Sequence, residues 1–184
     1  MRPDVRSPFY VAAVAVVVFF TMLGGSRLWD EDEPKNAACA REMLEADNWL
    51  VPQFNYQLRT DKPILLYWFM LASYGMFGVT EFAARFWSAT FAVGTTLLTF
   101  GLGRRLYGPR VGLWSGLALS GCLMFAVSGR AATPDSLLIF CTTSAFYLFA
   151  RFGGVDGAEL RRGGYAGTFA ALGAAVLAKG PVGV

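Results

Sequence analysis

"PFYVAAVAVVVFFTMLGG", residues 8–25, contains no charged side chain and follows a short N-terminus that carries Arg2 and Arg6. A helix of about 20 apolar residues is long enough to cross the hydrocarbon core of a bilayer. The backbone of such a segment must satisfy its own hydrogen bonds, which a helix does. This stretch therefore predicts a first helical membrane span. A signal peptide is the alternative reading, but no small-x-small cleavage site precedes Arg27.

The rest of the chain has the composition of a membrane protein. Of its 184 residues, 55% are hydrophobic and 16% are charged, and the mean hydropathy is +0.44. A soluble domain carries about a quarter charged residues. Further apolar runs predict four more spans, at about 86–103, 111–129, 135–152 and 163–178. The predicted fold class is therefore an all-α, polytopic transmembrane helical bundle.

The run at 63–80 is also uncharged and can be read in two ways. Lysine and arginine are enriched in the cytoplasmic loops of membrane proteins. If 63–80 does not cross, these residues divide evenly between the two sides, whereas a crossing would place most of them outside. We therefore expect interfacial or re-entrant helices in a first outer loop that covers 26–85. The N-terminus then faces the cytoplasm.

Several classes of function are excluded or disfavoured by composition. The net charge of +3 is small, and the arginines are scattered between apolar runs, so we expect no nucleic-acid partner. Cys39, Cys122 and Cys141 have no metal-ligand spacing and are read as small hydrophobic residues. The sequence contains no histidine, which leaves carboxylates, lysine and arginine as its candidate catalytic groups.

The outer loop begins with "DEDEP", residues 30–34. Pro34 suits the first turn of a helix, and "KNAACAREMLEA" (35–46) predicts a short amphipathic helix on the membrane surface. Acidic side chains at a helix N-terminus stabilise the helix dipole by about 0.3–1 kcal/mol each. This explains one or two of the four acidic residues, and by itself it assigns no chemistry to Asp32.

The five-span topology places five ionisable side chains on the outer membrane face: Asp32, Lys62, Arg130, Asp135 and Lys179. An ionisable residue at the mouth of a span is costly unless it is paired or hydrated, so a functional role is the first hypothesis. Structural roles stay open for four of them. Lys62 can snorkel beside Asp61, Asp135 can cap a helix, Arg130 can anchor the outer end of a span, and Lys179 can mark the membrane boundary.

Six segments, taken in their order along the chain, resemble one family. They are "DEPKNAACAREMLEADNWLVPQFN" (32–55), "TDKPILLYWFM" (60–70), "FGVTEFAARF" (77–86), "GRRLYG" (103–108), "GRAATPDSLL" (129–138) and "LAKGPVGV" (177–184). The sequence is similar to the GT-C-fold membrane glycosyltransferases that use polyprenyl-phosphate sugars, which include aminoarabinose transferases of lipid A and protein O-mannosyltransferases (glycosyltransferase family 39). Because family members have many more spans, we expect these residues to form the N-terminal part of a longer enzyme.

The resemblance implies a reaction and a set of roles. The reaction is inverting transfer of a sugar from a polyprenyl-phosphate donor to a hydroxyl of a lipid, glycan or protein acceptor, at the outer face of the cytoplasmic (inner) membrane. The catalytic candidates are Asp32 and Asp135, with Asp32 as general base or as the group that positions the acceptor. The substrate-binding candidates are Glu33, Lys62, Arg130 and Lys179, with Lys62 on the donor phosphate. No cofactor is implied.

The chain departs from the family pattern at three positions in this region. Asn36 stands where many relatives have an aromatic residue, Ile64 where they have a second proline, and Asp61 where glutamate is frequent. Some relatives bind a metal near that acidic residue. Because this chain supplies no histidine, we predict no metal ligands, and dependence on a divalent metal stays open.

Two other functions stay open at this stage. One is a non-catalytic membrane module that binds a polyprenyl-phosphate sugar. The other is a small transporter, for which we would expect ionisable residues deep within the spans or repeats that contain broken helices. The middles of the predicted spans are uncharged, which favours the enzyme.

Overall fold

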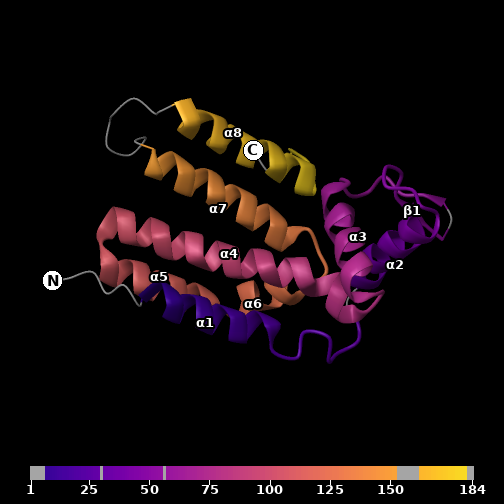
Figure 1. Cartoon of the computed structure of the whole chain (residues 1–184), viewed down its shortest axis with the longest axis horizontal. Coiled ribbons are helices and arrows are strands. Elements are labelled where there is room, and N and C mark those ends of the chain that lie inside the picture. The colour runs from indigo at the N-terminus through magenta and orange to yellow at the C-terminus, as the bar shows by residue number, and fades with distance from the viewer. Residues whose placement is uncertain (1–6, 30, 56, 153–161, 182–184) are drawn as a thin grey trace.

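The computed structural model describes residues 7–29, 31–55, 57–152 and 162–181 (Figure 1). Arg2, Arg6 and Arg161, which entered the topology prediction, lie outside these ranges. The elements are α1 Ser7–Phe20, α2 Asp32–Glu45, β1 Gln53–Phe54, β2 Gln57–Leu58, α3 Leu65–Phe77, α4 Glu81–Tyr107, α5 Pro109–Ser120, α6 Leu123–Arg130, α7 Asp135–Arg151 and α8 Arg162–Lys179. The described chain is therefore almost wholly helical, as predicted, apart from one short antiparallel hairpin.

α4 is the central helix of the bundle and packs against α1, α5 and α7. Thr80 caps its start, since the Ala83 N–H donates to Thr80 Oγ1 at 3.2 Å. Glu81 lies in the first turn and Arg104 and Arg105 in the last, where their charges stabilise the helix dipole. α4 is longer than the predicted span 86–103 because these capped, charged turns extend it at both ends.

The apolar run at 111–129, predicted as one span, consists of two helices. α5 and α6 are bent by 64° at the break between them. Gly121 follows the last residue of α5, and Cys122 then adopts an extended conformation (φ −72°, ψ 115°) before α6 begins. Because the residues at the break are as apolar as those around it, hydropathy alone does not reveal the bend.

Within the described ranges, α4 is the helix that is long and apolar enough to cross a membrane by itself. The bent pair α5–α6 meets the same criterion when its two helices are taken together. α1 and α3 are apolar but shorter, with 14 and 13 residues. The five-span topology stays a prediction.

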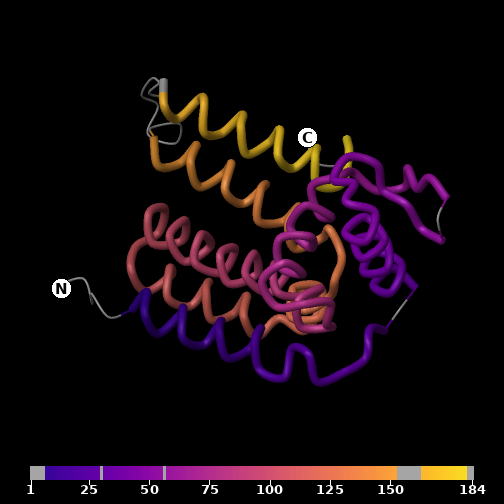
Figure 2. Tube along the Cα trace, turned by 45° about the vertical axis from the view of Figure 1, so that its right-hand side comes forward, coloured from indigo at the N-terminus to yellow at the C-terminus, as the bar shows by residue number. Residues whose placement is uncertain are grey.

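α2 and α3 pack on each other at one end of the bundle (Figures 1 and 2). Met43 of α2 and Tyr67 and Met70 of α3 are fully buried in this cluster. Burial also raises the pKa of the Tyr74 phenol to about 12, so the group is neutral near pH 7, and it donates a hydrogen bond to the Ala37 carbonyl at 3.3 Å. Cys39 is completely buried in the same cluster, and this burial raises the pKa of its thiol. The cluster fixes the first residues of α2 against the end of the bundle.

Candidate active site

Asp32 is the first residue of α2, and its carboxylate faces a lysine from the loop before α3. Lys62 Nζ donates to Asp32 Oδ2 at 3.3 Å. The Asp32 side chain is 46% exposed and that of Lys62 is 23% exposed. The structure therefore brings together a predicted general base and a predicted phosphate-binding cation, and it leaves the carboxylate open to a ligand from outside.

Glu33, the next residue, lies inside the protein. Its side chain is 1% exposed and forms a two-pronged ion pair with Arg85 of α4, at 2.9 Å from Arg85 Nε to Oε1 and 2.8 Å from Arg85 Nη2 to Oε2. The Trp29 N–H donates to Oε2 at 3.0 Å. A buried charge needs such partners, since desolvation is otherwise very costly. This geometry favours a positioning role for Glu33 over the direct substrate contact that we predicted.

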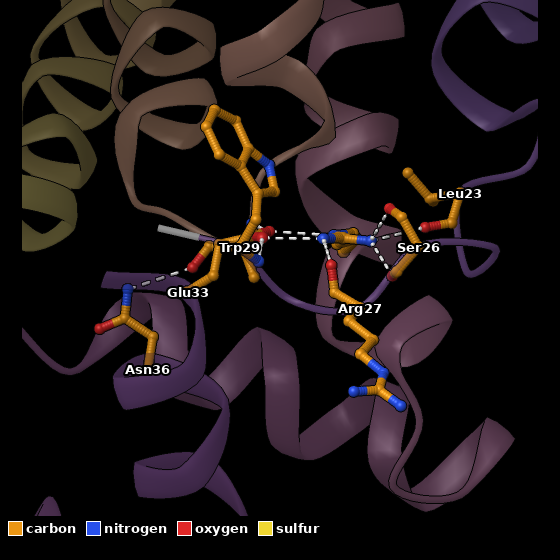
Figure 3. Close-up of polar contacts among 8 residues, drawn as sticks. Leu23, Ser26, Arg27, Trp29, Glu33 and Asn36 are labelled. Carbon is orange, nitrogen blue, oxygen red and sulfur yellow. Dashed lines mark hydrogen bonds and ion pairs between the residues drawn. The ribbon is translucent and has the colours of Figure 1, made fainter. Parts of the chain in front are cut away.

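Arg85 uses its remaining donors on the backbone between α1 and α2. Figure 3 labels the accepting residues Leu23, Ser26 and Arg27. Its Nη1 donates to the carbonyls of Leu23 and Ser26 at 3.1 and 2.9 Å, and its Nη2 donates to the Arg27 carbonyl at 3.1 Å. One side chain thus satisfies three carbonyls of an irregular segment that must enter α2 in a defined direction. The loop before Asp32 is held in place from within.

The loop between α6 and α7 is attached to α2 through the backbone N–H and carbonyl of Ala132. The Ala132 N–H donates to Glu33 Oε1 at 2.6 Å, and the Ala132 carbonyl accepts from Asn36 Nδ2 at 3.1 Å. Ala132 precedes Asp135, the first residue of α7, by three positions. The two hydrogen bonds therefore keep the start of α7 beside the start of α2, although the two lie about a hundred residues apart in the sequence.

Asp135 forms a second acid–lysine pair. Its Oδ1 accepts from Nζ of Lys179, the last residue of α8, and Thr133 Oγ1 lies 3.4 Å from its Oδ2. The Asp135 and Lys179 side chains are 40% and 36% exposed. As in the first pair, both groups stay accessible from outside. α7 and α8 pack along their length, which brings these two distant residues together.

Arg130, the last residue of α6, points toward α1. Its guanidinium donates to the carbonyls of Val18 and Thr21 at 2.6 and 2.7 Å. The last carbonyls of a helix have no partner within the helix, and a cation there also stabilises the dipole. The geometry favours the structural alternative, an anchor at the end of α1, and substrate binding by Arg130 stays a prediction.

Sequence reasoning missed two residues of this network. Arg85 lies in the segment 77–86, which resembles the family, but we predicted no role for it. Asn36 was identified only as a departure from the family pattern. The available signal for Arg85 was its position: an arginine at the start of an apolar run needs a partner or water. No local pattern names that partner, because Glu33 lies 52 residues earlier.

A polar cavity of 260 Å³ opens beside the hairpin, with Lys35, Arg59 and Asp61 among its lining residues. Arg59 is 7% exposed, lies over the ring of Phe54 at 5.5 Å, and is 3.6 Å from an Asp61 carboxylate oxygen. Asp61, one of the lining residues, directly precedes Lys62 in the chain. Among the described residues, no three or more Cys, Asp or Glu side chains are grouped so that they could hold a metal ion.

The chain matches one protein family over most of its length. The profile of the family described as dolichyl-phosphate-mannose-protein mannosyltransferase matches residues 61–184. Among curated proteins, the undecaprenyl phosphate-alpha-4-amino-4-deoxy-L-arabinose arabinosyl transferase of Edwardsiella ictaluri is 33% identical over 94% of this chain and 31% of its own length. The protein of the same name from Shewanella sediminis is 34% identical over 91% of this chain and 32% of its own length.

A similar structure has also been solved. ArnT from Cupriavidus metallidurans, in crystals with undecaprenyl phosphate bound, matches 95% of this chain and 32% of the ArnT chain, with a TM-score of 0.87 and 30% identity. Its apo form matches 96% of this chain, also with a TM-score of 0.87. This likeness confirms the predicted fold class, a polytopic helical membrane fold of the GT-C type. The chain spans 28–40% of the length of the first curated relatives that it matches.

Proposed function

The chain belongs to the dolichyl-phosphate-mannose-protein mannosyltransferase family, and on that premise we propose that it transfers a sugar from a polyprenyl-phosphate donor to a hydroxyl group. The name of the arabinosyl transferases and the undecaprenyl phosphate bound to ArnT support this class of donor. The observation that carries the proposal is the Asp32–Lys62 pair, in which a half-exposed carboxylate lies 3.3 Å from a cation.

The proposed reaction divides its work between these two groups. Asp32 accepts the proton of the acceptor hydroxyl while that oxygen attacks the anomeric carbon of the sugar. The new carbon–oxygen bond forms as the bond from the anomeric carbon to the phosphate oxygen breaks, with inversion at carbon. The polyprenyl phosphate leaves as an anion, and Lys62 stabilises the charge that develops on it. The acceptor is a lipid, a glycan or a protein.

The second pair, Asp135–Lys179, adds residues of α7 and α8 to the proposed site. Lys179 supplies another cation for the donor phosphate, and Asp135 orients the reacting groups. Because Ala132 holds the start of α7 against α2, both pairs belong to one end of the bundle. Two lysines suit the phosphodiester of the donor, because each ammonium is a compact charge on a flexible side chain. Each lysine can therefore keep its contact with the phosphate as the bond to the sugar breaks.

Lys62→Ala is expected to weaken donor binding by about 10- to 100-fold, because hydrogen bonds to charged groups contribute about 1.5–3 kcal/mol. Binding of a polyprenyl-phosphate sugar to the complete protein in nanodiscs measures the effect. Lys35→Ala is the matched control, since Lys35 is a neighbouring lysine of α2 that pairs with Glu31. Donor affinity that is equal in the two variants would remove Lys62 from the phosphate site.

We further propose that this end of the bundle faces the outside of the cytoplasmic membrane. Labelling of single cysteines tests the orientation in a variant whose three native cysteines are replaced. Gly75→Cys is expected to react with an impermeant maleimide in intact cells, because a Cβ atom at this position would meet no atom of another part of the chain within 4 Å. Tyr107→Cys, at a 75% exposed position, is expected to react only after permeabilisation. Labelling of position 107 in intact cells would contradict the five-span topology.

Release of polyprenyl phosphate by the complete, purified protein tests the proposed activity itself. We expect release only when both the sugar-linked donor and a membrane extract that contains the acceptor are present. The product is then identified by the mass of the added sugar. Donor binding without any release would instead indicate a non-catalytic donor-binding module.

A further inference from the structure

A cavity lies at the end of the bundle opposite α2 and α3. It has a volume of 650 Å³ and lies between the start of α1 and the last turns of α4 and α7. Figure 1 shows these three helix ends together, on the side away from α2 and α3. Volumes of about 300–1,000 Å³ are typical of sites for small molecules and cofactors. None of the proposed catalytic residues lines this cavity.

Three arginines line the cavity: Arg104, Arg105 and Arg151. Arg105 Nε donates to the Ala150 carbonyl at 2.6 Å, which ties the end of α4 to the end of α7. Arg151 Nη1 donates to the Tyr147 hydroxyl at 3.2 Å. Within the part of the chain that the structure describes, neither Arg104 nor Arg151 has a carboxylate within ion-pair distance.

Helix dipoles explain part of this arrangement. A cation in the last turn of a helix is stabilising, and both α4 and α7 carry arginine in the last turn. The dipole does not require that the guanidinium groups of two helices line the same cavity. Charges of one sign that converge in this way repel each other, and an anionic ligand would relieve the repulsion.

The remaining walls of the cavity are apolar. Leu97 and Phe100 lie one to two turns before the arginines on α4, and Pro8 closes the side formed by α1. A ligand that matches the whole cavity therefore has anionic oxygens at one end and hydrocarbon next to them. Guanidinium groups bind phosphate oxygens in a two-pronged geometry, which suits them to a phosphodiester headgroup.

We propose that this cavity binds an anionic phospholipid, with its phosphate between Arg104, Arg105 and Arg151 and the start of an acyl chain along Leu97 and Phe100. Basic pockets between transmembrane helices bind lipid headgroups in this manner, and each nearby cation contributes about 1 kcal/mol. The site is separate from the sugar-transfer site. The outcome of a lipid-binding test therefore does not affect the proposed sugar transfer.

Native mass spectrometry of the complete protein, released from nanodiscs, tests the proposal. The probes are phosphatidylglycerol and phosphatidylcholine with the same acyl chains. We expect the wild-type protein to retain phosphatidylglycerol selectively. The double variant Arg104→Gln/Arg151→Gln is expected to lower the affinity about 25-fold, or about fivefold for each arginine. Arg110→Gln is the matched control, because Arg110 lies at the same end of the bundle but does not line the cavity.

Three results would overturn the proposal. Equal retention of the two lipids by the wild-type protein would show that the charge of the headgroup is not recognised, and this comparison needs no variant. An equal loss in Arg110→Gln would indicate general attraction to an anionic surface. Inorganic phosphate is the last probe: if it raises the Tm of the detergent-purified protein as much as phosphatidylglycerol does, the cavity takes free phosphate and not a lipid.

Discussion

Asp32→Asn is expected to lower the rate of sugar transfer in the complete protein by about 10²- to 10⁴-fold, the usual contribution of a general base. Asparagine keeps the size of the side chain and an oxygen that can accept from Lys62, but it cannot take up the proton of the acceptor. Donor binding should therefore change much less than the rate. Single-turnover release of polyprenyl phosphate measures the chemical step, and a binding assay with the same donor measures the affinity.

Glu31→Gln is the matched control for Asp32→Asn. Glu31 belongs to the same acidic run, but its side chain is 81% exposed and pairs with Lys35. An exposed ion pair contributes only about 0–1 kcal/mol, so this variant should fold and turn over like the wild-type protein. If Asp32→Asn and Glu31→Gln released polyprenyl phosphate at the same rate, Asp32 would have no part in the mechanism, and Asp135 would become the next candidate.

Arg85→Met is expected to destabilise the folded protein by about 3–5 kcal/mol, because it leaves the buried Glu33 carboxylate without its cation. The backbone carbonyls between α1 and α2 would also lose their donors. A loss of this size is a large fraction of the stability of a typical domain. We expect a lower Tm in detergent and a smaller yield of monodisperse protein.

The ion pair can be separated from general packing effects with two further variants. Arg41→Met removes an ion pair of α2 in which both side chains are more than half exposed, and should change the Tm little. In Glu33→Gln/Arg85→Met both charges are gone, while the glutamine oxygen can still accept from the Ala132 N–H. We expect this double variant to regain the stability that the unpaired carboxylate costs, but not the part lost when the carbonyls between α1 and α2 lose their donors. A Tm of Arg85→Met equal to that of Arg41→Met would show that the buried pair is not important.

Much of the helical architecture could be predicted from local patterns. Pro34 and the acidic residues before it indicated the start of a helix, and α2 begins at Asp32, two positions earlier than proline itself. The run at 63–80 contains the helix α3, with 13 residues, and the first predicted span contains α1, with 14. The interfacial position of α3 stays a prediction. The bend between α5 and α6 could not be predicted, because Gly121 and Cys122 differ little in polarity from the residues on either side.

The residues of the candidate site could be named from the sequence, but their contacts could not, and their roles stay predictions. The order of the family segments pointed to Asp32, Lys62, Asp135 and Lys179, and the structure pairs them two by two. The pairing itself depends on tertiary structure, since Lys179 lies 44 residues after Asp135. The roles of Glu33 and Arg85 in holding the loop depend on tertiary structure, because only burial distinguishes Glu33 from the other acidic residues of its run.

The attachment of Ala132 to Glu33 and Asn36 sets an order of events during synthesis. Ala132 is made 99 residues after Glu33, an interval of roughly 5–20 s at the usual translation rate of about 5–20 residues per second. Until then, the Glu33 carboxylate can contact Arg85 but not the Ala132 N–H, and α2 lacks its contacts with the start of α7. The contacts of the proposed catalytic end therefore form in two steps during synthesis. The second step, in which Ala132 contacts Glu33 and Asn36, follows the emergence of the start of α7 from the ribosome.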